Sequence, residues 1–205
     1  MKISETVYML DCTEGSHVYA ILGDAVTLVD TCMPGRAGAI LDELKSLGVQ
    51  PGQIRRILLT HHDIDHIGSA GALQQASGAE VFAPLEDIPY ILGQKPRPGI
   101  KKYLSMFWKA GKPADMQAYP EDGSLGDIQV IATPGHTPGH VCLLYQDVLF
   151  AGDLVATRSG VIKPSPGVMT WNMPLLLQSI EKVRPLSFRW VCPAHGNPLE
   201  RGSML

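Results

Sequence analysis

Seven histidine and aspartate residues of this sequence have the same kind of setting. Each one comes shortly after the end of an apolar, strand-like segment. They are His61, Asp63, Asp65, His66, His136, Asp153 and His195. Carboxylates and imidazoles at the buried end of a strand are costly to desolvate unless they are paired, so packing alone does not explain them. Nitrogen and oxygen ligands with an imidazole majority and no thiolate suit zinc, iron or manganese rather than calcium or an iron–sulfur cluster. The sequence therefore predicts a metal site.

The spacing of these residues indicates two neighbouring binding points. Alternate residues in an extended segment point the same way, so His61 and Asp63 can reach one point in space. Asp65 and His66 lie past the bend and can reach a second point nearby. Loops that leave the same edge of a sheet often converge on one cleft in layered α/β proteins, which would bring in the three remaining side chains.

The segments that must position these residues are short strands and amphipathic helices. Runs of β-branched and aromatic residues predict strands, and apolar residues at a 3.6-residue spacing predict helices. We expect strands at 6–10, 17–22, 25–29, 54–59, 80–83, 128–132, 141–145, 148–150 and 188–192, helices at 37–47, 69–76 and from 172 onward, a tight hairpin at 146–147, and a loop at 157–171. A β-meander followed by β-α-β-α-β indicates packed layers of sheet and helix.

The segment 84–119 differs from the rest of the chain because prolines, lysines and aromatic residues are interleaved in it. The residues concerned include Lys101, Lys102, Tyr103, Phe107, Trp108 and Lys109. One interpretation is an amphipathic helical insertion whose aromatic side chains pack down while its lysines face water. The other is a lid over a pocket. In both cases the segment is an insertion within a single domain that spans residues 1–205.

The composition is that of a globular protein that can bury a core without disulfides. Hydrophobic residues make up 45% and charged residues 18% of the 205 residues, and 17 basic against 20 acidic side chains leave a net charge of −3. That balance argues against nucleic acid or a membrane as the partner and leaves a small-molecule substrate, with the oligomeric state unspecified. Polar residues interrupt the N-terminus, and the four scattered cysteines form no CxxC pair. We therefore expect a cytoplasmic protein.

Four motifs in this chain resemble those of the metallo-β-lactamase-fold hydrolases, and the resemblance covers almost the whole chain. Residues 61–66, His-His-Asp-Ile-Asp-His, are similar to the first motif of that family, His-x-His-x-Asp-His. Segments 135–140, 151–153 and 193–196 resemble its remaining ligand motifs in the same order, and 28–31 resembles its early strand-to-turn signature. The fold that this implies is α+β, an αββα sandwich of two mixed β-sheets flanked by helices.

Asp63 stands where the family motif has its second histidine. His62 is one residue out of register and should point away from the metal, with a misregistered His62 ligand as the alternative. A carboxylate at this position makes the first site harder than three imidazoles would, so iron or manganese becomes more plausible beside zinc. Flavo-diiron proteins, which are similar in fold, have a carboxylate at the same position and hold iron. They also carry a flavin-binding domain, for which this chain has no room.

The resemblance implies two divalent metal ions, with zinc as the first choice. The first ion would be held by His61, Asp63 and His136, the second by Asp65, His66 and His195, with Asp153 bridging. A metal-bound hydroxide, in a bridging position, would attack the substrate carbonyl, and the same cations would stabilise the oxyanion. Asp65 would be the catalytic residue that orients the hydroxide or accepts its proton. His140 would be a structural residue or, alternatively, a further ligand.

The expected function is a metal-dependent hydrolase that acts on an activated carbonyl such as a thioester, lactone or ester. β-Lactam hydrolysis is disfavoured because no export signal is seen. Glutathione-thioester hydrolysis is disfavoured because the chain stops ten residues after His195, where those enzymes carry a helical region. The charge balance disfavours nucleic-acid cleavage. Two other classes stay open, a di-iron oxidoreductase-like protein and a non-catalytic binding protein on the same fold.

Overall fold

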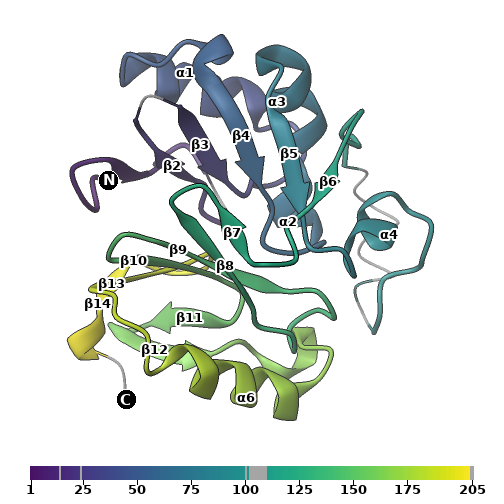
Figure 1. Ribbon diagram of the computed structural model, residues 1–205, viewed down its shortest axis with the longest axis vertical. Coiled ribbons are helices and arrows are strands. Elements are labelled where there is room, and N and C mark those ends of the chain that lie inside the picture. Colours follow the sequence, from purple (N-terminus) through teal and green to yellow (C-terminus); the bar gives the residue numbers. More distant parts are fainter. Residues whose placement is uncertain (14, 24, 100, 102–109, 204–205) are drawn as a thin grey trace.

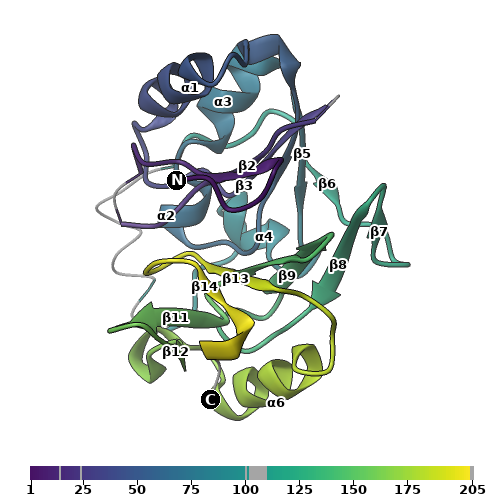
Figure 2. The ribbon, with the colours of Figure 1, turned by 90° about the vertical axis from the view of Figure 1, so that its left-hand side faces the viewer.

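The computed structural model describes residues 1–13, 15–23, 25–99, 101 and 110–203, and two six-stranded β-sheets face each other at its centre (Figure 1). Helices α1 (Ala37–Ser46) and α3 (Ala70–Ser77) cover the outer face of one sheet, and α6 (Met173–Val183) covers the other (Figure 2). The predicted αββα sandwich is confirmed. No helix in the described part of the chain is long and apolar enough to cross a bilayer.

The sheet from the N-terminal half has the strand order β1-β2-β3-β4-β5-β6. Its strands are β1 (Val7–Met9), β2 (Tyr19–Ile21), β3 (Val26–Val29), β4 (Ile54–Leu58), β5 (Glu80–Ala83) and β6 (Gln117–Ala118). The first three strands pair antiparallel, whereas β3 to β6 run parallel. Parallel neighbours need a crossover connection, and α1 and α3 provide the crossovers on either side of β4.

The sheet from the C-terminal half has the strand order β14-β13-β10-β9-β8-β7. Its strands are β7 (Ser124–Leu125), β8 (Ile128–Ala132), β9 (Val141–Tyr145), β10 (Val148–Gly152), β13 (Trp190–Pro193) and β14 (Leu199–Glu200). Tyr145 pairs with Val148, so the predicted tight hairpin at 146–147 is confirmed. Only β10 and β13 pair in parallel within this sheet, because α6 lies between them in the chain.

Alternation along the strands divides the core into three layers. Leu28 faces the helices α1 and α3, and its neighbour Val29 faces the opposite sheet. In the second sheet, Phe150 points between the sheets while Leu149 and Ala151 point toward α6. Because successive side chains of a strand point to opposite faces, each central strand joins two layers at once. The strand ends are thereby held rigidly, which matters for the side chains that follow them.

The prediction of a loop over 157–171 is wrong for the first part of this segment, where the structure has a β-hairpin. Strand β11 (Val155–Arg158) pairs antiparallel with β12 (Val161–Pro164). The two linking residues, Ser159 and Gly160, have φ values of 53° and 74°, the left-handed conformation that two-residue hairpin turns require. The Pro, Gly and Ser content of the stretch suggested a loop because the strands on either side of the turn are only four residues long.

The insertion at 84–119 begins with a single helical turn, α4 (Ile88–Ile91), and ends in β6. Residues 100 and 102–109, which carry most of the lysines and all the aromatic residues on which the two interpretations depend, lie outside the described residues. Lys101 is described and is buried, with 5% of its surface exposed. The expectation that the lysines face water is therefore wrong for Lys101, because its ammonium group lies against charged and polar side chains inside the molecule.

Candidate metal centre

The predicted ligand side chains follow the ends of four strands that belong to both sheets. His61 and Asp63 lie in the loop after β4, and Asp63 directly precedes α2 (Ile64–Ile67), a single helical turn that carries Asp65 and His66. Because the chain changes direction at this helical turn, Asp65 and His66 point to a different position from His61 and Asp63. His136, Asp153 and His195 follow β8, β10 and β13, which end at the same side of the other sheet.

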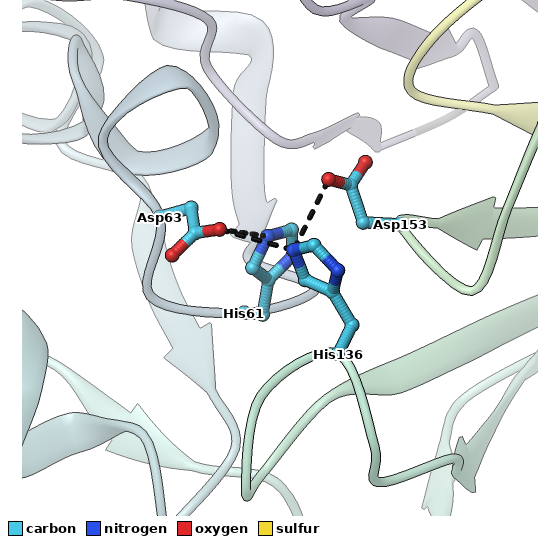
Figure 3. A group of neighbouring side chains, drawn as sticks. All are labelled: His61, Asp63, His136 and Asp153. Atoms are coloured by element: carbon cyan, nitrogen blue, oxygen red, sulfur yellow. Dashed lines mark hydrogen bonds and ion pairs between the residues drawn. The ribbon is translucent and has the colours of Figure 1, made fainter. Parts of the chain in front are cut away.

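The first ligand group consists of His61, Asp63, His136 and Asp153, all buried, with ligand atoms within 4.8 Å of one another (Figure 3). Asp63 Oδ2 lies 3.4 Å from His61 Nε2 and 3.0 Å from His136 Nε2. Asp153 Oδ2 lies 3.2 Å from the same nitrogen of His136. Two carboxylates and two imidazoles thus point at one position.

The second ligand group consists of Asp65, His66 and His195, and its ligand atoms also lie within 4.8 Å of one another. Asp65 Oδ2 is 3.8 Å from His66 Nε2 and 3.4 Å from His195 Nε2. Asp153 Oδ1 lies 3.5 Å from His66 Nε2 and 3.3 Å from His195 Nε2. Asp153 therefore presents one carboxylate oxygen to each group. The structure brings all seven predicted side chains together.

Buried atoms in both groups lack the hydrogen bonds that burial normally demands. In the described part of the chain, His61 Nε2, His66 Nε2 and Asp153 Oδ1 are buried and make no hydrogen bond. Buried polar atoms without partners are rare in folded proteins and often mark the site of an ion. Imidazole nitrogens and carboxylate oxygens are the ligands of zinc, iron and manganese. The residues present thus fit divalent metal ions.

Asp30 holds His66 from behind. Its Oδ2 lies 2.8 Å from His66 Nδ1 and accepts a hydrogen bond of 2.8 Å from the Thr60 hydroxyl, while its Oδ1 accepts one of 2.8 Å from the Thr60 backbone N–H. A carboxylate on Nδ1 orients the ring so that Nε2 points into the second ligand group. Burial lowers the pKa of His66, but the charges of Asp30, Asp65 and Asp153 outweigh it and hold that pKa well above its usual value.

His140 lies outside both ligand groups and supports Asp153 instead. Its Nε2 accepts a hydrogen bond of 3.0 Å from the backbone N–H of Asp153, so its Nδ1 carries the hydrogen and donates to Thr133 Oγ1, 2.9 Å away. Burial, with a smaller contribution from His136, lowers the pKa of His140 to about 3. Gly152 has a φ of 48°, and a Cβ there would lie 2.7 Å from His140 Nε2, so glycine lets the two loops approach.

His62 is also buried, but its ring lies behind Asp63 and not among the ligand atoms of the first group. Its Nδ1 lies 2.9 Å from Asp87 Oδ2, and the ring stacks on Tyr90 with a centroid distance of 4.6 Å. Neither ligand group in the described residues includes it. Burial raises the pKa of Asp87, but the contact with His62 outweighs burial, and the net effect lowers that pKa. The orientation that residue alternation predicts for His62 and Asp63 is the one that the structure has.

Sequence reasoning missed that Lys101 enters the site. Its Nζ lies 2.5 Å from Asp63 Oδ2 and 2.9 Å from His136 Nε2. Burial raises the pKa of Asp63, but the charge of Lys101 and the contacts with His136 and His61 hold it well below its usual value. Nothing in the local sequence distinguishes Lys101 from its neighbouring lysine, because the approach depends on how residues 35 positions apart are folded together.

A cavity of about 330 Å³ opens beside both ligand groups. Asp63, Asp65, His136, Asp153 and His195 line it on one side. Ala156, Pro166 and Met169 form an apolar part of the wall, and Arg158 adds a positive charge. A small molecule in this cavity would have polar, metal-binding side chains on one side and apolar surface on another.

Known proteins resemble this chain in sequence and in fold. The family model described as "Metallo-beta-lactamase superfamily" matches residues 13–195. "Probable metallo-hydrolase YflN" of Bacillus subtilis is 31% identical over 199 residues, which cover 84% of this chain and 75% of that protein. A hydroxyacylglutathione hydrolase of Albidiferax ferrireducens is 32% identical over 170 residues, which cover 79% of this chain but 55% of that protein.

The crystal structure of the metallo-beta-lactamase family protein TTHA1429 from Thermus thermophilus matches with a TM-score of 0.77 at 24% identity, over 97% of this chain and 76% of that one. This likeness concerns the fold. The family match includes all seven ligand-type residues, and YflN is a probable metallo-hydrolase by name. The chain belongs to the metallo-beta-lactamase superfamily and is a metal-dependent hydrolase.

Proposed function

We propose that this protein hydrolyses a small substrate with an activated carbonyl carbon, namely a thioester, lactone or ester, and that two divalent metal ions take part. The observation that carries the proposal is the junction of two ligand groups at Asp153, beside a cavity large enough for a small molecule. Hydrolysis of this kind needs an activated water and a stabilised oxyanion close together. Two adjacent cation sites on one side of a cavity meet both needs.

The first ligand group would hold one ion and the second ligand group the other, with one oxygen of Asp153 directed at each. Metal ions there would supply Lewis-acid chemistry, which lowers the pKa of a water from about 15.7 to about 7 and polarises a carbonyl. We propose zinc as the native ion. The carboxylate of Asp63 in the first ligand group also makes iron or manganese acceptable.

Asp65 is the carboxylate that can act directly on a substrate in the cavity. Its side chain is 26% exposed and lines the cavity, whereas those of Asp63 and Asp153 are 8% and 9% exposed. We propose that one of its oxygens faces the second ligand group while the carboxylate orients the attacking water and accepts its proton. The apolar wall at Ala156, Pro166 and Met169 would contact the acyl or ring portion of the substrate.

The names of relatives support a thioester among these substrates. Several relatives are named hydroxyacylglutathione hydrolase, and this chain spans 55% of the length of two of them. We extend only the reaction type to this chain. Direct assay with glutathione thioesters and with other thioesters identifies the thiol portion.

A hydrolysis screen with metal-replete protein tests the proposal. Thioester, lactone and phosphodiester substrates are offered to the wild type, to Asp65→Asn and to the exposed control Glu181→Gln. We expect hydrolysis of a carbonyl substrate, a loss of roughly 100-fold or more in kcat for Asp65→Asn from the missing proton acceptor, and no loss for the control. Two bound metals with no carbonyl hydrolysis would contradict the proposal, and redox-active iron would instead favour an oxidoreductase.

A further inference from the structure

A second buried pair, His62 and Asp87, lies directly behind the first ligand group and has no role in the proposed chemistry. Both side chains are fully buried. His62 comes from the loop that carries His61 and Asp63, and Asp87 precedes α4. The two residues are 25 positions apart, so their contact is made by the fold and not by the local chain.

Asp87 joins the two loops that supply the first ligand group. Its Oδ2 accepts hydrogen bonds from the His62 backbone N–H at 3.0 Å and from the Thr137 hydroxyl at 2.8 Å. Its Oδ1 accepts one of 2.8 Å from the Gly139 backbone N–H. A Cβ on Gly139 would lie 2.8 Å from Asp87 Oδ1, so this approach requires glycine. One carboxylate thus holds the loop of Asp63 against the loop of His136.

His62 extends this support from Asp87 to Asp63. With Nδ1 at 2.9 Å from Asp87 Oδ2, the opposite nitrogen, Nε2, faces Asp63 Oδ1 at 3.7 Å. Stacking on Tyr90 and a hydrogen bond of 3.1 Å from Arg97 Nε to the His62 carbonyl fix the ring and its backbone. The distance of 3.7 Å is too long for a hydrogen bond, and neither ring nitrogen of His62 makes one within the described residues. The fixed ring thus places a polar edge beside Oδ1 and limits how far the carboxylate can turn.

Asp63 needs such support because its two oxygens have different surroundings. Oδ2 faces His61 and His136 in the first ligand group. Oδ1 is buried and makes no hydrogen bond within the described residues, and His62 Nε2 lies 3.7 Å from it. A carboxylate that is free to rotate can present either oxygen, or both, to an ion. A carboxylate with one oxygen restrained presents the other.

We propose that Asp87 and His62 are positioning residues that fix Asp63 with Oδ2 directed into the first ligand group, and so set the affinity and metal preference of that group alone. This inference rests on the proposed function insofar as the first ligand group holds a metal ion. A purely structural role would need only the hydrogen bonds that Asp87 makes to the two loops. The direction of His62 Nε2 toward Asp63 is the feature that such a role leaves unexplained.

Metal titrations on variants that keep one ligand group test this inference. The His195→Ala background leaves the first ligand group intact, and the His136→Ala background leaves the second intact. His62→Phe, which keeps a ring to stack on Tyr90 but removes both nitrogens, is introduced into each. Zinc and manganese affinities are measured by competition with a chelating dye, and the cobalt-substituted proteins are compared by their visible absorption spectra.

We expect His62→Phe to weaken zinc binding about 10- to 100-fold in the His195→Ala background, as loss of an outer-shell partner does, and to shift the zinc-to-manganese ratio and the cobalt spectrum. Metal affinity in the His136→Ala background should change less than about threefold, which is the variation expected when two sites are not energetically coupled. Equal effects in both backgrounds, or an unchanged ratio in the first, would overturn the inference. Wild-type protein that binds two metals and hydrolyses its substrate would leave the proposed function standing in that case.

His62→Gln and Asp87→Asn keep the inference testable where His62→Phe does not fold. The Gln amide can still approach Asp63 Oδ1, so His62→Gln should retain more of the first group's zinc affinity than His62→Phe. Asp87→Asn keeps an oxygen for the Gly139 N–H but loses the charge beside His62, and it should weaken the first group only. A fall in the melting temperature of the metal-free variants with unchanged metal affinities would show a structural role and overturn the inference.

Discussion

The two ligand groups are built from the same residue types but differ in exposure and in the charges around them. Every member of the first ligand group is buried, whereas in the second the side chains of Asp65 and His195 are 26% and 38% exposed. In the first group, burial and the neighbouring His66 hold the pKa of His61 well below its usual value. In the second, the carboxylates of Asp153 and Asp65 outweigh burial and raise the pKa of His195 to about 10.

The difference shows that burial by itself does not decide the protonation of a histidine. His61 and His66 are both fully buried, yet their pKa values are shifted in opposite directions. His66 has Asp30, Asp65 and Asp153 around it, while the first group has Lys101 to balance its carboxylates. In the metal-free protein, protons therefore neutralise the second group and a lysine neutralises the first.

The largest effect is expected at the residue that the two groups share. Asp153→Asn removes the charge that faces both groups while keeping the side chain's size. We expect a loss of more than about 100-fold in kcat/KM, beyond the roughly 10- to 100-fold typical of an outer-shell residue, together with loss of metal from both groups. Metal analysis and steady-state kinetics measure this. Retention of two tightly bound metals would show that Asp153 does not join the groups.

A smaller effect, of about 100-fold in affinity, should separate the groups when the pH is lowered from 8 to 7, because two protons are displaced at about tenfold each. With their pKa values raised, His66 and His195 are protonated in the metal-free protein, so metal must displace their protons. The stability that the His195 proton gives the metal-free protein is present below about pH 6.5 and is lost as the pH rises through about 10. Each displaced proton costs about tenfold in metal affinity per pH unit.

Equilibrium dialysis at pH 8, 7 and 6 followed by metal analysis measures this dependence. We expect the metal content to fall first from two ions to one, because His61, unlike His66 and His195, is neutral over the whole range and has no proton for the metal to displace. Loss of both ions over the same pH range would contradict the expected difference in proton binding between the two ligand groups.

Asp63→His should change the metal preference of the first group by about tenfold, at the low end of changes around a metal site. An imidazole in place of the carboxylate makes the ligand set softer, so zinc should bind more tightly relative to manganese. Some loss of rate is expected from the added bulk, so the ratio of affinities is the informative quantity. Competition titration of the wild type and the variant with both metals measures it. An unchanged ratio with lowered stability would mean that Asp63 is no ligand.

The smallest effect is expected at Lys101. Its ammonium lies against Asp63 Oδ2 and His136 Nε2, where it competes with a cation for the first group. Lys101→Met should raise the affinity of that group for metal by up to about fivefold, because the desolvation cost of a buried ion pair cancels most of its attraction and leaves a net contribution of about 1 kcal/mol. Lys112→Met, at an exposed lysine that contacts the carbonyl of Leu92, is the matched control. Weaker metal binding in Lys101→Met would show that the ammonium supports the ion instead.

Residue type and spacing in the sequence determined most of the fold and the identity of the candidate ligands. The helical period in 37–47 predicts α1, and the apolar runs before His61, His136, Asp153 and His195 predict the strands that end there. These are local signals, because the period of the apolar residues follows from the geometry of one helix or strand. The hairpin at β11 and β12 was missed because its strands are short and its turn has no strong local signature.

Only the tertiary structure decided which side chains meet behind the ligands. Asp87 reaches His62 and Gly139 across 25 and 52 residues, and Lys101 reaches His136 across 35. No period or motif encodes such contacts, because they depend on how loops from two sheets pack when the sandwich closes. The sequence by itself determined which residues can bind a metal. The packing of the two sheets decided which of them share a site, which remain charged, and which partners hold them in place.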